Sequence, residues 1–218
     1  MQEWLSLHDE HVAIDGDFGL ATESALQDFQ SKSKLPVTGI VDESTFNTLV
    51  LPITNALAPI PTDNKTLGEL VVAYAKQHLA QHPREVGGQN SGPWVRLYMN
   101  GNEGNDWPWC AGFVCFCLKQ ACTSLKQALP IKATFSCDSL AAFAKNEGLF
   151  VTSAKAGPGS FFLVRRTDTD WTHIGIVTEI NSEIMKTIEG NTNDEGSREG
   201  YEVCARTRSL NKMDFIQI

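Results

Sequence analysis

The 218-residue sequence lacks several features that would each indicate a distinct class of protein. It contains no apolar run of the ~18–20 residues that a membrane-spanning helix requires, so no transmembrane segment and no membrane insertion is predicted. Its first residues, Met1 to Trp4, include no basic stretch followed by an apolar one, which predicts that no classical signal peptide is present. The six cysteines are too few and too unevenly spaced for a disulfide-stapled scaffold.

Positive charge is also scarce. The chain has 18 Lys and Arg residues against 26 Asp and Glu residues, and its formal net charge is −8. Nine of the acidic residues but only two of the basic ones fall within residues 1–51. Because a nucleic-acid-binding domain requires a basic surface, we exclude nucleic acid as a partner. The acidity of the N-terminal part is interpreted as a solvated surface.

The sequence does have a globular composition, 42% hydrophobic and 20% charged, and its length suits one large or two small domains. The clearest boundary contains Pro52, Pro59 and Pro61 among Thr, Asn and Asp residues. Three prolines exclude a continuous helix and stiffen a tether. We therefore predict three parts: a domain over residues 1–51, a proline-rich linker over 52–66 and a second domain over 67–218.

The first domain contains a weak internal repeat. Residues 16–22 resemble residues 39–45, and in each copy a glycine-containing turn leads to a threonine, Thr22 or Thr45, that can cap a helix. Apolar residues at helical spacing follow each threonine. The pattern predicts a small helical domain built from two similar turn–helix units.

In the second domain, helical patterns come first and strand patterns follow. A capping box at residues 66–69 begins one helix, residues 87–106 predict a long loop, and apolar helices are expected from Cys110 to Ala121 and near residues 139–146. Four later segments have the pattern of strands, at residues 160–165, 173–180, 184–189 and 202–206. The predicted fold class is α+β, with N-terminal helices followed by an antiparallel sheet.

Cys110 and His173 are the candidate reactive pair. Cys110 begins the predicted helix, where free N–H groups and the helix dipole favour the reactive thiolate. His173 is the only histidine after Cys110 and begins an apolar strand, and histidine is the usual base for a thiol nucleophile. The alternative is that Cys110 is an ordinary buried cysteine and His173 a solvent-facing residue at a strand end.

The base needs an orienting partner, and the next predicted strand offers two. It ends in Glu189-Gly190-Asn191, whose acid and amide are two residues apart and can point to the same side. Trp107, Trp109 and Trp171 are candidates for lining a substrate cleft, although buried aromatic residues more often belong to a core.

No metal site is predicted, because the cysteines form no Cys-x-x-Cys pair and no histidine completes a zinc set. The cysteines other than Cys110 are interpreted as structural, while a disulfide involving Cys137 or Cys204 stays open. The loop over residues 100–106 is rich in oxygen donors that suit calcium, but it lacks the EF-hand pattern. We favour an ordinary polar turn over a calcium site.

Three segments together resemble the CHAP domain (cysteine, histidine-dependent amidohydrolase/peptidase): residues 109–114, 173–175 and 189–191. The resemblance runs from about residue 67 to residue 218 and implies a papain-like α+β fold. It also implies that Cys110 is the nucleophile and His173 the base, with Glu189 and Asn191 on the next strand. By analogy with Cys–His–Asn sites, we prefer Asn191 as the residue that orients His173. The related NlpC-type peptidases often use a second histidine, which this sequence does not offer.

The first domain independently resembles the peptidoglycan-binding domain 1 family, through residues 15–22, 25–30 and 39–49. The resemblance implies binding to the stem peptide of peptidoglycan. The segment ahead of Asp15 is shorter than in the family pattern, so the first helix is expected either to pack poorly or to begin at Met1.

Together the two resemblances imply a peptidoglycan hydrolase that cleaves an amide bond in the peptide part of the bacterial cell wall and requires no cofactor. It would be an N-acetylmuramoyl-L-alanine amidase or an endopeptidase. A phage-type lysin and an antibacterial effector with an immunity protein as partner both fit a protein that leaves the cytoplasm without a signal peptide and acts at the wall. The alternatives are a catalytically inactive wall-binding protein and an amidase of a small peptide conjugate.

Overall fold

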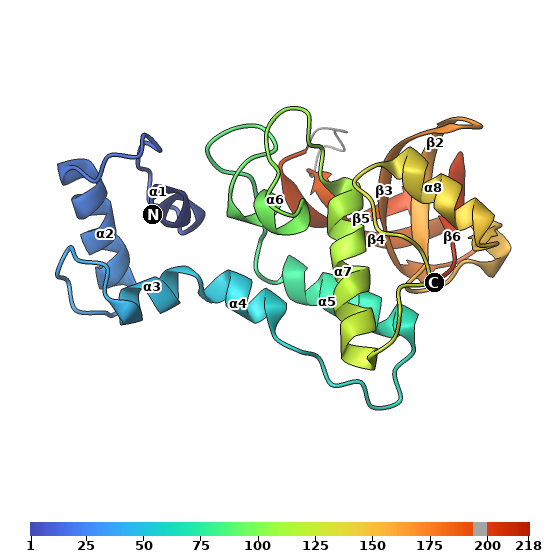
Figure 1. Ribbon diagram of the computed structural model, residues 1–218, viewed down its shortest axis with the longest axis horizontal. Helices are drawn as coiled ribbons and strands as arrows, with labels where there is room; N and C mark the ends of the chain where they lie inside the picture. The colour runs from blue at the N-terminus through green and yellow to red at the C-terminus, as the bar shows by residue number, and fades with distance from the viewer. Residues whose placement is uncertain (194–199) are drawn as a thin grey trace.

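The computed structural model describes residues 1–193 and 200–218 and contains a small helical lobe and a larger α+β lobe (Figure 1). The small lobe consists of α1 (Gln2–Leu7), α2 (Leu20–Lys32) and α3 (Glu43–Leu49). Its own core includes Leu5, which is fully buried. The helix α1 therefore begins at Gln2 and packs well despite its six residues, so the expectation of poor packing is wrong.

Two buried glutamines each hold one copy of the internal repeat, by hydrogen bonds to its glycine and its threonine. Gln2 accepts a hydrogen bond from the Gly16 N–H (2.9 Å) and donates one to the Thr22 hydroxyl (3.1 Å). Gln30 makes the same two contacts with the matching glycine (3.0 Å) and threonine (3.1 Å) of the second copy. Both threonines thus lie inside the module and do not cap helices as predicted; α3, for example, is capped by the Asp42 side chain.

The predicted proline-rich linker begins as a helix, α4 (Leu51–Leu57), rather than as an extended tether. Pro52 lies in its first turn, where a missing N–H breaks no intrahelical hydrogen bond. Ala56 is buried in the core of the large lobe, and its carbonyl accepts hydrogen bonds from the Gln77 and Gln120 side chains. The first half of the linker is therefore part of the packed structure.

The large lobe begins with four helices: α5 (Leu67–Leu79), α6 (Pro93–Tyr98), α7 (Cys110–Leu125) and α8 (Cys137–Asn146). The predicted capping box of Thr66 and Glu69 is present at the start of α5. The helix α6 interrupts the segment expected to be a single long loop, because Pro93 begins a helical turn whose Trp94 and Val95 are buried.

A sheet of six antiparallel strands follows, in the order β1-β6-β2-β3-β4-β5. The strands are β1 (Phe150–Val151), β2 (Phe161–Thr167), β3 (Asp170–Ile180), β4 (Ile184–Thr192), β5 (Glu202–Ser209) and β6 (Met213–Ile216), with a short 3₁₀ turn η1 (Ser153–Lys155) after β1. The α+β class and the order of helices before strands are as predicted. The short strands β1 and β6 were not predicted, because two and four residues show no alternation of apolar and polar positions.

The helix α7 packs against α5 on one side and against β3 and β4 on the other. Ile174 and Ile176 of β3 belong to the core beneath this helix, whereas Val177 belongs to a separate apolar cluster. Because neighbouring residues of a strand face opposite sides of its sheet, His173 and Gly175 share the side of Val177. Cys110, the first residue of α7, lies next to His173 and Ile174 of β3.

Two glycines allow these elements to approach closely. A Cβ atom at Gly190 of β4 would lie 2.8 Å from Phe113 Cβ and from the Trp109 ring, and one at Gly175 would lie 2.8 Å from Glu189 Cγ. The absent side chains therefore let α7 lie directly on β4 and leave room for the Glu189 side chain beside β3.

The two lobes contact each other through α1, which lies on the side of the small lobe that faces α6 (Figure 1). Arg96 of α6 pairs with Glu3 of α1 (2.6 Å) and with Glu103 (2.7 Å), and Arg84 donates to the backbone carbonyl of Leu7 (3.0 Å). Leu7 itself packs against the core of the large lobe. The small helix thus contributes apolar side chains to both cores.

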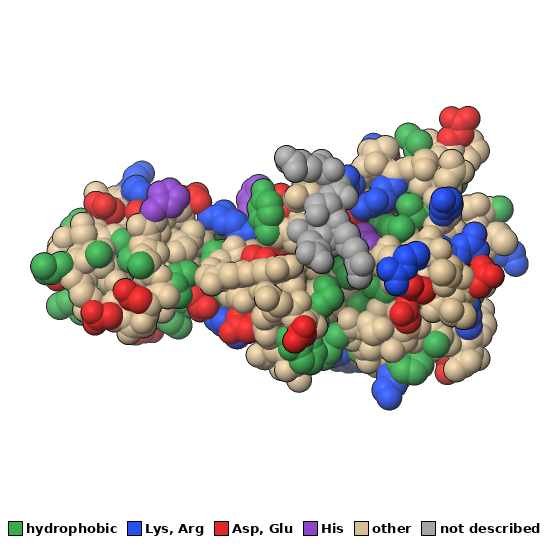
Figure 2. Space-filling model, turned by 90° about the horizontal axis from the view of Figure 1, so that it is seen from above, with side chains coloured by type: hydrophobic (Ala, Val, Ile, Leu, Met, Phe, Trp, Pro, Cys, Tyr) green, Lys and Arg blue, Asp and Glu red, His purple; other side chains and the backbone are tan. Residues whose placement is uncertain are grey.

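Figure 2 shows acidic and exposed apolar side chains on the small lobe, while most of the Lys and Arg side chains in that view lie on the large lobe. Most of the N-terminal acidic residues are therefore solvated, as interpreted from the sequence, whereas Glu10 is buried and pairs with Lys32. Among the described residues, every helix is too short or too polar to cross a membrane.

We expect Gly190→Ala to destabilise the fold by roughly 1–3 kcal/mol, because its methyl group would push β4 away from Phe113 and Trp109. Urea unfolding followed by tryptophan fluorescence measures this loss. Gly157→Ala is the matched control, since nothing lies within 4 Å of its added Cβ. Equal stability of the two variants would contradict the close-packing argument.

Candidate active site

Cys110 is the first residue of α7 and has 7% of its surface exposed, at the floor of an open cleft. The first N–H groups of a helix have no intrahelical acceptor, and together with the helix dipole they favour an anion at this position. The start of the helix is fixed by Asn191, whose side-chain oxygen accepts the backbone N–H of Trp109 (3.0 Å). The structure therefore places the thiol at the start of a helix, as the sequence predicted.

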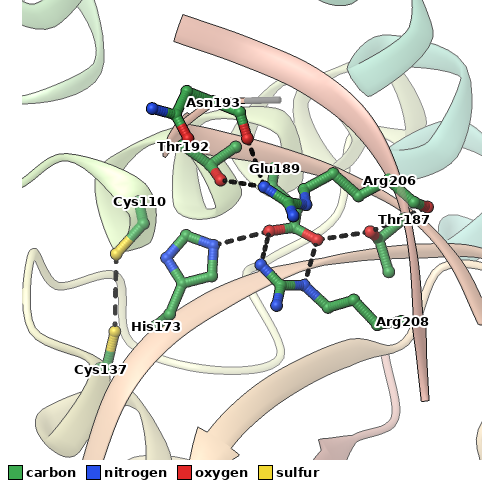
Figure 3. Close-up of polar contacts among 9 residues, drawn as sticks. All are labelled: Cys110, Cys137, His173, Thr187, Glu189, Thr192, Asn193, Arg206 and Arg208. Carbon is green, nitrogen blue, oxygen red and sulfur yellow. Dashed lines mark hydrogen bonds and ion pairs between the residues drawn. The ribbon is translucent and has the colours of Figure 1, made fainter. Parts of the chain in front are cut away.

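His173 of β3 lies beside Cys110, and Figure 3 shows its ring between the Cys110 sulfur and the Glu189 carboxylate. Its Nε2 atom is 2.8 Å from Glu189 Oε2. Its Nδ1 atom is buried on the Cys110 side and has no hydrogen-bond partner among the described residues. One ring nitrogen is thus held by a carboxylate, which leaves the other for proton exchange with the thiol.

Glu189 is completely buried, and it is held by more groups than the sequence indicated. Arg208 of β5 donates two hydrogen bonds to its carboxylate, from Nε and Nη2, both at 2.6 Å. The Thr187 hydroxyl donates a third at 2.5 Å. Thr187 could have been found from its position two residues before Glu189 on the same strand, but Arg208 depends on the pairing of β4 with β5, which the sequence does not display.

The charges of the three central groups depend on one another. Burial alone would lower the pKa of His173, but the neighbouring Cys110 and Glu189 outweigh burial and raise it to about 9. Burial would raise the pKa of Glu189, but Arg208 and His173 hold it at about 2. A hydrogen bond from Cys137, with the contributions of His173 and the Ile174 backbone, keeps the pKa of Cys110 well below its usual range. These directions favour a thiolate on Cys110 and an imidazolium on His173.

The preference for Asn191 as the orienting residue is corrected by these contacts, because Glu189 holds His173. Asn191 has a positive φ of 55°, which interrupts the regular alternation of β4 and turns its side chain away from the imidazole. Its amide donates to Asn90 Oδ1 (3.2 Å), and the half-buried Glu85 accepts a hydrogen bond from the Trp109 indole (2.8 Å). Asn191 thus supports the start of α7, in a polar network that includes Glu85, which the sequence analysis did not single out.

Two of the three predicted tryptophans line the cleft. Trp107 and Trp171 both border it, and its cavity volume is about 550 Å³. Trp109 does not, because it is fully buried and stacks on Tyr98 with ring centroids 5.5 Å apart. The prediction of a substrate contact for Trp109 is therefore corrected to a role in the core.

Cys137 also lies in the cleft, at the start of α8, with its sulfur 3.7 Å from the Cys110 sulfur (Figure 3). The interpretation of Cys137 as a merely structural residue does not account for this position. In the part of the chain that the structure describes, no cluster of three or more His, Cys, Asp or Glu side chains could hold a metal ion. Glu103, in the loop for which an ordinary polar turn was favoured over a calcium site, pairs with Arg96, and the choice between the two stays a prediction.

A thiol at a helix start, an imidazole beside it and a carboxylate behind the imidazole define the class of cysteine-dependent acyl-transfer enzymes. Comparison with protein families finds two families that match parts of this chain. Residues 1–49 match the family described as "Putative peptidoglycan binding domain", and residues 102–191 match the CHAP domain. No curated protein and no solved structure matches the chain significantly.

The chain thus carries a peptidoglycan-binding domain followed by a CHAP domain, as the sequence predicted. The matched CHAP segment includes Cys110, His173, Glu189 and Asn191. The two matches support a role in hydrolysing or binding the bacterial cell wall. The CHAP match indicates a cysteine- and histidine-dependent amidohydrolase or peptidase.

The charge pattern predicts that kcat/KM falls above about pH 9, as the His173 imidazolium loses its proton. Glu189→Gln should move this alkaline limb to lower pH, because it removes the negative charge that favours the imidazolium and leaves the Arg208 cation nearby. The measurement is the pH dependence of kcat/KM for both proteins, with thermal unfolding as a check of folding. An unchanged alkaline limb in a folded variant would contradict the pairing.

Arg208→Met should destabilise the protein by about 3 kcal/mol, since it leaves the buried Glu189 carboxylate without its bidentate partner. Arg208→Lys keeps the charge but loses the fork of two parallel hydrogen bonds, so its loss should be smaller. Chemical unfolding of the three proteins at one pH tests this order. A Met variant as stable as the wild type would show that Glu189 does not depend on Arg208.

Proposed function

We propose that this protein is a peptidoglycan hydrolase that cleaves an amide bond in the peptide part of the bacterial cell wall. The observation that carries the proposal is the meeting of Cys110, His173 and Glu189 at one open cleft, in a domain that follows a peptidoglycan-binding domain. A wall-binding domain raises the concentration of its catalytic partner on a polymeric substrate.

Acylation begins with the Cys110 thiolate, which attacks the carbonyl carbon of the substrate amide. The negative charge that develops on the carbonyl oxygen is stabilised by the Cys110 backbone N–H at the start of α7. The His173 imidazolium gives its proton to the leaving nitrogen, and the C–N bond breaks. The products of this step are a free amine and a thioester on Cys110.

Deacylation reverses the roles. Neutral His173 takes a proton from a water molecule, which attacks the thioester carbonyl and releases the carboxylic acid and the Cys110 thiolate. Glu189 stays ionised throughout, because Arg208 and Thr187 satisfy its oxygens. It orients the ring and stabilises the imidazolium that forms in each cycle.

The residues that line the cleft do not define which amide is cut. N-acetylmuramoyl-L-alanine amidase activity and endopeptidase activity would use the same three residues. We propose action at the wall after release from the producing cell, as a phage-type lysin or as an injected antibacterial effector. In the second case an immunity protein is the expected partner.

An inactive wall-binding protein is the second candidate, and the first domain supports it as well as it supports the hydrolase. It does not explain why a thiol, an imidazole and a buried carboxylate are aligned and shift the pKa values of one another. An amidase of a small peptide conjugate would use the aligned groups but has no need of a wall-binding domain.

Digestion of purified Gram-negative and Gram-positive sacculi tests the proposal. The wild type should release soluble fragments, and Cys110→Ala should reduce the rate by about 10³-fold or more, because it removes the nucleophile. Mass spectrometry of the products then identifies the bond: free stem peptides indicate an amidase, and shortened or uncrosslinked muropeptides indicate an endopeptidase.

The control is sedimentation of both proteins with the same sacculi. Binding by both proteins without release from either wall, with and without calcium, would favour the inactive wall-binding protein. Neither binding nor release would favour a small conjugate as substrate.

A further inference from the structure

The sulfur atoms of Cys110 and Cys137 are 3.7 Å apart, which is direct contact between the two atoms. Both residues line the same open cleft, one at the start of α7 and the other at the start of α8 (Figure 3). The mechanism proposed above requires no second thiol. A cysteine touching the nucleophile from a different helix therefore needs a separate explanation.

The geometry suits a covalent bond between the two sulfurs. A disulfide has an S–S length of about 2.05 Å, so the sulfurs must approach by about 1.7 Å. Cys137 is the first residue of α8 and follows residues 126–136, which form no helix or strand. Its side chain is at a helix end next to irregular backbone, where a rotation about χ1 meets less resistance than in the middle of a packed helix.

The two thiols are not equivalent. The pKa of Cys110 is lowered by the hydrogen bond from Cys137 and by His173, whereas the pKa of Cys137 is raised by the adjacent Cys110 and by burial. Cys110 is thus the thiolate that reacts first, and Cys137 retains its proton until a leaving group is available. This division of roles is that of an attacking and a resolving cysteine.

We propose that Cys110 and Cys137 form a redox-modification site, which reacts with small disulfides of the glutathione type and closes into a reversible intramolecular disulfide. The chemistry of this site does not depend on the proposed function. The effect of the disulfide on hydrolysis does depend on the proposed function, because the disulfide removes the thiolate that would attack the wall peptide.

The reaction balances in two exchange steps. The Cys110 thiolate attacks one sulfur of the small disulfide, forms a mixed disulfide and releases one small thiolate. Cys137 loses its proton to that thiolate and attacks the Cys110 sulfur, which releases the second small thiolate. The His173 imidazolium, which holds the proton of Cys110, gives it to the second small thiolate. In total the two protein thiols lose two electrons and two protons, and the small disulfide is reduced to two thiols.

The closed form would protect the nucleophile. A thiolate at the floor of an exposed cleft is open to oxidation to sulfinic acid, which is irreversible without a dedicated repair enzyme. A disulfide with Cys137 prevents this oxidation, and a thiol reductant returns both cysteines. Once the disulfide has formed, hydrolysis would resume only after a reductant has reopened it.

The test uses the full-length reduced protein, incubated with glutathione disulfide, treated with iodoacetamide and digested for peptide mass mapping. We expect one cross-linked peptide pair that joins Cys110 to Cys137, and its loss after treatment with dithiothreitol. In Cys137→Ser, Cys110 should stop at the glutathione mixed disulfide. Cys122→Ser, on the same helix as Cys110, should still form the cross-link.

A wild type that accumulates the mixed disulfide at Cys110, or that links Cys110 to another cysteine, would overturn the proposal. The wild-type map needs no variant, so a folding defect in Cys137→Ser cannot obscure this result. Release of fragments from sacculi is measured separately on the reduced and the oxidised protein. A cross-link without activity in the reduced protein would refute the hydrolase and leave the redox site intact.

Discussion

The buried carboxylate of Glu189 is the constraint on which the rest of the site depends. A buried charge is tolerated only when its oxygens are fully hydrogen-bonded, and here the partners come from three strands: His173 of β3, Thr187 of β4 and Arg208 of β5. A shift of either strand pair by one residue would turn these side chains to opposite faces of the sheet. The same bonds that satisfy the charge therefore fix the strand register and the orientation of the imidazole.

The nucleophile comes from a different layer, so close packing of helix on sheet has to complete the site. Gly190 permits this contact at β4, and Asn191 reinforces it by accepting the Trp109 N–H. The segment Glu189-Gly190-Asn191 thus combines three tasks in consecutive residues: one orients the base, one allows the helix to approach and one holds the helix start. The three residues are consecutive because all three contacts are made at the same place, where β4 packs against the start of α7.

The sequence predicted most of the local features, although Thr22 and Thr45 do not cap helices, and it predicted few of the contacts between elements. Cys110, His173 and Glu189 were found because helix starts and strand ends have local signatures, and the capping box at Thr66 is likewise local. The contact of Cys110 with Cys137 and that of Glu189 with Arg208 depend on how α8 meets α7 and how β5 pairs with β4. Asn191 was misassigned because its positive φ breaks the strand alternation on which the prediction relied. Local residue patterns contain none of this information.

The arrangement of the two lobes bears on how wall binding and cleavage are coupled. A flexible tether would raise local concentration without setting an orientation. Here α1 places Leu5 in one core and Leu7 against the other, and α4 is packed where a tether was expected. Each partly exposed ion pair of Arg96 adds no more than about 1 kcal/mol, so the shared apolar contacts are the firmer part of the junction. Arg96 also holds Glu103, in the segment that leads to Asn105 and Asp106 of the cleft, so one side chain connects the junction between the lobes to the cleft wall.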